Sequence, residues 1–162
     1  MSDTPSPAQS PLPLGRGVTL IAEDANGLIA FAKPAGVLSH PNTADEQPRS
    51  LLQAAYAFEG EYFSWTDPAT GELRRVWLLN RLDSATSGVI LAALNEALAA
   101  EIRAHFKRKQ VRKVYHALVF GAPRQPIELW RDLLAVEKRE GRIRTATRAG
   151  HIPAECRMSI AR

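Results

Sequence analysis

The sequence has few of the residues on which metal sites and disulfides depend. Its 162 residues include one cysteine, Cys156, and four scattered histidines. One cysteine cannot form an intrachain disulfide, and neither thiolates nor imidazoles recur at the intervals of a zinc site. We therefore expect no disulfide, no metal and no metal cofactor.

Long apolar runs are missing as well. The longest falls far short of the roughly 18 residues needed to cross a bilayer. The N-terminus also lacks the basic and then apolar layout of a secretory signal. These absences predict a cytoplasmic protein without a membrane partner. The hydrophobic content of 45% is instead sufficient for the core of one globular domain.

Positive charge is concentrated in two parts of the chain. The formal net charge is +4 and the pI about 9.6, which suits a polyanionic partner without requiring one. The first cluster comprises Arg103, Lys107, Arg108, Lys109, Arg112 and Lys113. The second comprises Lys138, Arg139, Arg142, Arg144 and Arg148. Either cluster fits a solvated face as well as a surface that contacts phosphates.

The N-terminal part predicts a tail followed by a hairpin. Residues 1–15 are rich in Pro and Ser and lack periodicity, so we expect a flexible tail before a domain spanning 16–162. Val18 to Ala32 carries two apolar runs around an Asp, Asn and Gly turn, which predicts a β-hairpin. Lys33-Pro34 ends its second strand. We expect Lys33 to be structural or interfacial rather than catalytic.

Two helices are predicted from apolar spacing. Arg49 to Phe58 predicts a short amphipathic helix with Ser50 as its cap. Asn95 is expected to cap a second helix. Its predicted core stripe is Leu94, Leu98, Ile102 and Phe106.

The remaining segments predict strands. Gly88 to Leu94 is apolar throughout, which favours a strand buried on both faces. Arg112 to Phe120 alternates, which predicts a strand with Lys113 and Tyr115 on one side. Residues 132–147 predict a basic hairpin that turns near Glu140-Gly141. Strands outnumber helices, so the predicted class is α+β with a largely antiparallel sheet.

The stretch Asn80-Arg81-Leu82-Asp83, followed by Ser-Ala-Thr-Ser, lies between a short apolar strand predicted over Val76 to Leu79 and the predicted strand of Gly88 to Leu94. An aspartate acts as a nucleophile only when ionised, and the neighbouring Arg81 would favour the charged form of Asp83. An Arg and Asp pair can equally do no more than brace a turn. The residues alone leave both interpretations open.

A longer pattern resembles a known family. Residues 80–91, NRLDSATSGVIL, resemble the signature loop of the RluA-like RNA pseudouridine synthases, in which His-Arg-Leu-Asp precedes Thr-Ser-Gly and a hydrophobic strand. FAKPAGVLSHP, at 31–41, is similar to the family's Asn-Lys-Pro-Ala-Gly strand and loop. RKVYHALVFG, at 112–121, is similar to its Lys-x-Tyr strand. The resemblance runs from about Val18 to the end of the chain and is weakest after Gly121.

The resemblance implies the pseudouridine synthase fold, a mixed, mostly antiparallel sheet flanked by helices. It implies isomerisation of uridine to pseudouridine in ribosomal or transfer RNA, with no cofactor. Asp83 would be the catalytic aspartate, and Tyr115 would pack on the target base and assist proton removal from C5. A complete enzyme is expected to be monomeric. The expected RNA-binding residues are Arg81, Lys107, Arg108, Lys109, Arg112 and Lys113.

The sequence departs from the family pattern in two places. Asn80 stands where the family usually has histidine, which affects loop packing or RNA contacts more than the reaction. The family also continues through a Gly-Arg-x-His-Gln-Leu-Arg-like segment that supplies an arginine facing the catalytic aspartate, whereas this sequence stops at Arg162. We therefore expect a C-terminally incomplete fold. Two hypotheses follow: a pseudouridine synthase, or a truncated, non-catalytic RNA-binding remnant of one.

Overall fold

A computed structural model describes residues 12–139, 142–146 and 150–161. The chain divides into two compact units, Met1–Lys113 and Val114–Arg162. The division falls within the single domain that the sequence predicted. In the described residues, no helix has the length and apolar character to cross a membrane.

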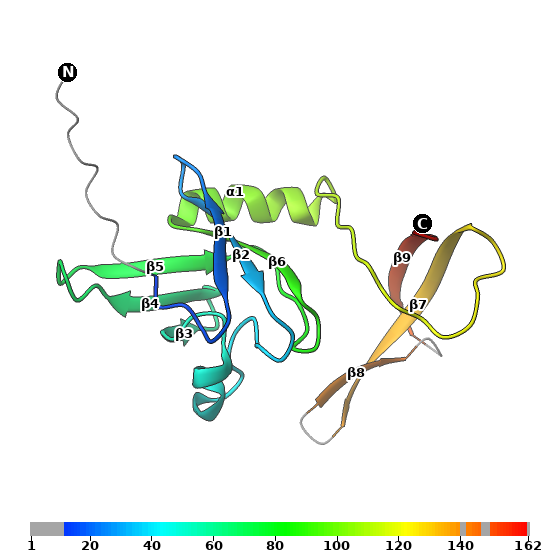
Figure 1. The fold of residues 1–162 in the computed structure, drawn as a ribbon, viewed down its shortest axis with the longest axis horizontal. Helices are drawn as coiled ribbons and strands as arrows, with labels where there is room; N and C mark the ends of the chain where they lie inside the picture. The colour runs from blue at the N-terminus through cyan, green and yellow to red at the C-terminus, as the bar shows by residue number, and fades with distance from the viewer. Residues whose placement is uncertain (1–11, 140–141, 147–149, 162) are drawn as a thin grey trace. The chain divides into compact units, whose positions relative to one another are not determined.

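The first unit is built on a six-stranded antiparallel sheet (Figure 1). Across the sheet the order is β1 (Thr19–Glu23), β2 (Leu28–Lys33), β6 (Gly88–Ala93), β5 (Leu73–Leu78), β4 (Tyr62–Thr66) and β3 (Ala55–Ala57). The predicted β1–β2 hairpin is confirmed. Pairing of β2 with β6 sets Lys33 opposite Gly88, which brings together two segments far apart in the sequence.

Helix α1 (Glu96–Lys107) packs on one face of this sheet (Figure 1). The predicted cap is confirmed, because the Asn95 side chain accepts a hydrogen bond from the Leu98 N–H at 2.8 Å. Leu98, Ile102 and Phe106 pack against a cluster of Trp77, Leu79, Ala93 and Ala99. Leu94 precedes the helix and is exposed, so the predicted stripe is correct for its other members.

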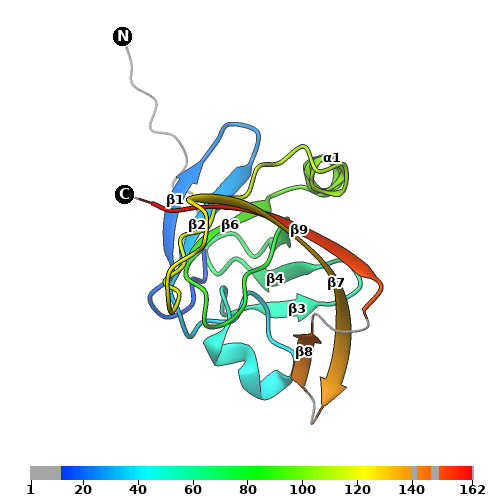
Figure 2. The same cartoon turned by 90° about the vertical axis from the view of Figure 1, so that its right-hand side faces the viewer.

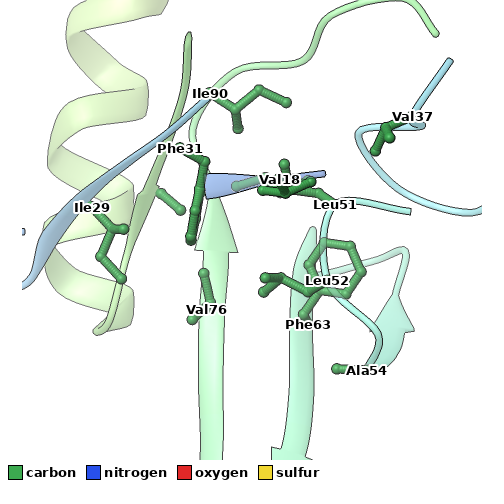
Figure 3. Close-up of a cluster of buried hydrophobic side chains, with 12 residues drawn as sticks. Val18, Ile29, Phe31, Val37, Leu51, Leu52, Ala54, Phe63, Val76 and Ile90 are labelled. Carbon is green, nitrogen blue, oxygen red and sulfur yellow. The ribbon is translucent and has the colours of Figure 1, made fainter. Parts of the chain in front are cut away.

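The main core lies on the other side of β5 and β6, because successive residues of a strand face opposite sides of a sheet. Figure 3 shows this cluster, in which Phe31 and Ile90 meet side chains from several segments. Its buried members are Val18, Ile29, Phe31, Val37, Leu51, Leu52, Ala54, Phe63, Val76, Leu78, Ile90 and Ala92. Strand β6 is therefore buried on both faces near its end, as predicted, although Gly88 and Val89 at its start are exposed.

The predicted helix over Arg49 to Phe58 is wrong. A 3-10 helix, η1 (Ala44–Arg49), ends where that helix was expected to begin, and β3 follows. Leu51 and Leu52 are both fully buried, in a segment of bends and one isolated bridge, Leu14 to Leu52, rather than a helix. Ser50 follows the C-terminal end of η1, where its hydroxyl bonds to backbone carbonyls, instead of capping the N-terminus of a helix. Tertiary burial has overridden the local spacing here.

The predicted tail is too long at its C-terminal end. Leu12 and Leu14 pack against the main core, and the Gly15 N–H donates to the Leu51 carbonyl at 2.8 Å. Gly15 is required at this contact, because a Cβ atom there would lie 2.0 Å from the Ser50 carbonyl oxygen. Residues 1–11 lie outside the described part of the chain.

The second unit contains a three-stranded antiparallel sheet with β7 in the centre. The first part of β7 (Ile127–Arg139) pairs with β9 (Ile152–Ser159), and its last part pairs with β8 (Arg142–Ala146). Figure 2 shows the curved course of β7 beside β9. The two strands of the predicted basic hairpin are confirmed, whereas its turn at Glu140-Gly141 lies outside the described residues.

The predicted strand over Arg112 to Phe120 is not formed. The structure assigns this segment to no strand, and the side chains of Leu118 and Phe120 are fully exposed. An alternating sequence forms a strand only where a second strand pairs with its N–H and C=O groups. Among the described residues no strand does so. Lys113 and Tyr115, which were expected on one face of this strand, fall in different units.

Candidate active site

Asp83 lies in the loop where β5 and β6 diverge. The two strands are paired at Trp77–Ala93 and Leu78–Ala92. In the loop that follows, Leu82 packs against the main core, whereas Arg81 and Asp83 on either side of it are exposed. One partly buried leucine thus anchors a loop in which the charged side chains on either side are exposed.

Asn80 extends the strand pairing into this loop. Its Oδ1 atom accepts a hydrogen bond from the Leu91 N–H at 2.7 Å, and its Nδ2 atom donates to the Val89 carbonyl at 3.2 Å. The side-chain amide therefore bonds to two backbone groups of β6, beyond the last residues that pair β5 with β6. The residue that departs from the family pattern has a structural role in this chain.

Ser39 holds the backbone next to Asp83. Its hydroxyl accepts a hydrogen bond from the Leu82 N–H at 2.9 Å and donates to the Leu82 carbonyl at 2.7 Å. Ser39 is buried, so both bonds are partly shielded from water. One hydroxyl fixes both polar backbone groups of the residue that precedes Asp83.

Lys33 holds the residue that follows Asp83. It is only 1% exposed, and its ammonium group donates to the carbonyls of Pro34, Val37 and Ser84. The Gly36 N–H also donates to the Ser84 carbonyl, at 2.7 Å. Burial lowers the pKa of Lys33, and the negative charge of Asp83 opposes that shift. The structural role expected for this lysine is the one observed.

Arg81 pairs with partners other than Asp83. Its Nη1 atom lies 3.5 Å from the Glu61 carboxylate and 3.3 Å from Nε2 of His40. Within the described part of the chain no ion pair joins Arg81 to Asp83, so the direct pairing expected between these two side chains is not formed. The arginine remains 58% exposed, and Glu61 and His40 orient it.

Arg103 supports the turn that carries Glu61. Its guanidinium group donates to the carbonyls of Gly60, Glu61 and Leu78 and lies 3.6 Å from the Glu61 carboxylate. Glu61 has a φ of 51°, a left-handed conformation that is strained for a residue with a side chain. Arg103, counted in the first basic cluster, is therefore committed to the fold rather than free for phosphates.

Two of the predicted RNA-binding residues meet at one hollow. Arg81 and Lys113 both line a cavity of about 290 Å³, together with Glu61, Asn80 and Phe106. The other predicted cations are exposed at or after the end of α1, namely Lys107, Arg108, Lys109 and Arg112. Tyr115 belongs to the second unit, where it is 59% exposed.

Sequence reasoning missed the residues that hold the loop. Ser39 and Glu61 carry no recognisable signal, because a buried hydroxyl and a left-handed glutamate are defined only by their neighbours. His40 lies within the segment 31–41 that matches the family, where nothing in the sequence indicates a role for it, whereas it contacts Arg81 in the structure. Lys33, which directly precedes a proline at the end of an apolar strand, was the one support that the pattern indicated.

Comparison with known proteins assigns the family. The model of the RNA pseudouridylate synthase family matches residues 27–160. An uncharacterized RNA pseudouridine synthase of Mycobacterium tuberculosis is 32% identical over 124 residues, which cover 76% of this chain and 38% of the relative. The dual-specificity RNA pseudouridine synthase RluA of Haemophilus influenzae is 34% identical over 109 residues, which cover 67% of this chain and 43% of the relative.

Two further matches carry related names. The tRNA pseudouridine synthase C of Vibrio cholerae is 33% identical over 95 residues, which cover 58% of this chain and 34% of the relative. A solved structure, human RNA Pseudouridylate Synthase Domain Containing 4, has a TM-score of 0.48 and 15% identity over 85% of this chain and 51% of that chain. The chain spans less than half the length of these curated relatives. Because the family model matches most of its residues, the chain belongs to the RNA pseudouridylate synthase family and is RluA-like.

Proposed function

We propose that this chain carries the catalytic aspartate of an RNA pseudouridine synthase that acts on ribosomal or transfer RNA. The observation that carries the proposal is the placement of Asp83. Its side chain is exposed, while Ser39 fixes the backbone of the residue before it and Lys33 the backbone of the residue after it. A reactive group held on a supported backbone loses little freedom when it meets a substrate.

The reaction exchanges one glycosidic bond for another. The bond between N1 of the base and C1′ of the ribose breaks, the base turns, and C5 bonds to C1′. The proton on C5 then leaves, and N1 ends with a proton. The Asp83 carboxylate would act on the ribose or the base during this exchange, by attack at C1′, by addition at C6, or by assisting a glycal intermediate.

The target uridine must leave its stack to reach Asp83. We propose that Tyr115 packs on the extruded base and assists proton removal from C5. Arg81, Lys107, Arg108, Lys109, Arg112 and Lys113 would contact the phosphates. Exposed cations of this kind release counterions from RNA, so binding should weaken steeply as salt rises.

The proposal is tested by incubating the full chain with bulk ribosomal and transfer RNA that lacks pseudouridine. The RNA is then digested, and the nucleosides are separated by chromatography. We expect a pseudouridine peak from the unmutated chain and none from Asp83→Ala. Asp45→Ala is the matched control, because Asp45 is an exposed aspartate of the same unit and lies in η1.

The alternative is a chain that binds RNA without catalysing the reaction. RNA binding by the unmutated chain with no pseudouridine peak would reject the enzyme proposal for this polypeptide and favour the alternative. Equal product from Asp83→Ala and the unmutated chain would reject Asp83 as the catalytic residue.

A further inference from the structure

Three aromatic rings form a cluster beside Arg81. His40 and Tyr56 are stacked, with ring centroids 4.7 Å apart and planes 5° apart. Phe58 stands nearly perpendicular to both, at 5.9 Å from His40 and 5.2 Å from Tyr56. Perpendicular contacts of this kind are favourable for aromatic rings and fix their orientation. Phe58 is nevertheless 57% exposed, so an apolar ring is held in place while part of it faces solvent.

The cluster is anchored in the core. Tyr56 pairs with Phe63 across β3 and β4, and their ring centroids are 4.9 Å apart. Phe63 is fully buried. Phe58 begins the turn between these strands, and Arg103 holds the carbonyls of that turn at Gly60 and Glu61. A ring supported in this way loses little conformational entropy when a ligand packs on it.

The same cluster is connected to the Asp83 loop by two short paths. Ser39, next to His40, makes both hydrogen bonds to the backbone of Leu82. The His40 ring itself lies 3.3 Å from the Arg81 guanidinium group. The rings and the candidate catalytic loop are therefore parts of one supported surface within the first unit.

The chemistry of this surface selects its ligand. An exposed ring offers stacking to any nucleobase, and a neighbouring exposed arginine offers a charge to the phosphate that follows that base. Proteins read single-stranded RNA with this combination, since its unstacked bases can pack on aromatic side chains. Lys113, which lines the same hollow as Arg81, adds positive charge beside it.

We propose that His40, Tyr56 and Phe58 form a stacking platform for an unstacked RNA base near the target uridine, with Phe58 providing the exposed ring and Arg81 the adjacent phosphate contact. The inference rests on the RNA partner of the proposed function. It adds a site for a second nucleotide, distinct from the uridine that reacts at Asp83.

The test compares ring and charge variants in binding to a labelled single-stranded RNA of about 12 nucleotides, measured by fluorescence anisotropy at several salt concentrations. We expect Phe58→Leu to weaken binding by about tenfold. The slope of the logarithm of the binding constant against the logarithm of the salt concentration should stay unchanged, since no phosphate contact is lost. Arg81→Gln should reduce the magnitude of that slope by about 1, the value for the loss of one phosphate contact. Phe58→Trp keeps a ring and should retain the affinity.

Two controls isolate stacking from a folding defect. Leu73→Ala removes another exposed apolar side chain of the same unit and should bind RNA as the unmutated chain does. An oligomer that lacks its bases should reduce the difference between the unmutated chain and Phe58→Leu to less than twofold. If the two chains bind the oligomer without bases almost equally, the effect of Phe58 on affinity depends on a base.

Phe58→Leu binding within twofold of the unmutated chain overturns the platform, as does an equal loss on the oligomer without bases. Pseudouridine formation with unchanged RNA affinity in Phe58→Leu rejects the platform and leaves the proposed function standing. RNA binding that depends on Phe58 without pseudouridine formation rejects the proposed function and leaves the platform standing. An unmutated chain that binds no RNA overturns both.

Discussion

The ammonium nitrogen of Lys33 lies 3.3 Å from the carbonyl oxygen of Ser84, although 51 positions separate the two residues in the sequence. Pairing of β2 with β6 brings the Lys33 end of one strand to the start of the other. The lysine therefore couples the end of the hairpin to the residue that follows Asp83. This contact explains why a buried charge is retained beside an exposed aspartate.

Replacing Lys33 by methionine should destabilise the fold. The substitution keeps an unbranched side chain, one atom shorter, and removes the donor to three backbone carbonyls. Leaving a buried acceptor unpaired, here the Val37 carbonyl, costs about 1 to 3 kcal/mol, so we expect a loss of about that size in the free energy of unfolding. Urea denaturation measures it. Lys107→Met, at an exposed site, should change stability by less than about 0.5 kcal/mol.

The same lysine should give stability a specific pH dependence. Burial lowers the pKa of Lys33 in the folded protein, whereas the unfolded chain keeps the ordinary value of 10.5. Between the two values the unfolded chain binds more protons, so the contribution of Lys33 to stability rises with pH in this window. Below the folded pKa its contribution is constant. The free energy difference between the unmutated chain and Lys33→Met should therefore increase toward pH 10.5.

That difference is measured by urea denaturation of both chains at a series of alkaline pH values. Subtracting the two curves cancels the titration of the other lysines and of the tyrosines, which both chains share. A difference that stays flat, or falls, as the pH approaches 10.5 would contradict the burial of a charged Lys33.

Ser39 should support both stability and the rate of reaction. Ser39→Ala leaves the partly buried N–H and carbonyl of Leu82 without the hydroxyl partner, at a cost of about 1 to 2 kcal/mol. We expect kcat for pseudouridine formation to fall more than KM rises, because the altered backbone positions Asp83 rather than the bulk of the RNA. Steady-state kinetics on RNA test this. Ser159→Ala, exposed in β9, should leave both constants unchanged.

Asn80 should matter through its hydrogen bonds to β6. Asn80→Ala removes the acceptor for the Leu91 N–H and the donor to the Val89 carbonyl, so we expect a loss of about 1 to 2 kcal/mol. Asn80→Asp keeps the acceptor and loses the donor, so its stability should lie between that of the unmutated chain and that of Asn80→Ala. Thermal unfolding ranks the three chains. A ranking with Asn80→Asp below Asn80→Ala would show that the contact with Leu91 is of little importance.

The parts of the structure with local signals were predictable from the sequence. The hairpin from Val18 to Ala32 has a turn between two apolar runs, and Asn95 has the side chain that a helix cap needs. The loop that carries Asp83 was recognisable because its residues match the order and spacing of the family's signature loop. In each case the determining contacts lie within a few residues of one another or within one motif.

The failures concern segments whose structure depends on distant partners. Leu51 and Leu52 belong to a set of apolar residues at helical spacing, but their burial in the cluster that contains β2 and β4 side chains decides their conformation. Arg112 to Phe120 alternates like a strand but has no strand to pair with among the described residues. Arg81 was expected to pair with Asp83, its near neighbour, and instead contacts Glu61 and His40, which come from other loops.

If Asp83 is the catalytic residue, loss of the proton from C5 of the target uridine depends on its carboxylate. RNA labelled with tritium at C5 of uridine is mixed with excess protein, and tritium release is followed in a single turnover. At matched RNA occupancy, the unmutated chain should release tritium while Asp83→Asn should release none above background. Release at similar rates from both chains would show that Asp83 is not the catalytic residue.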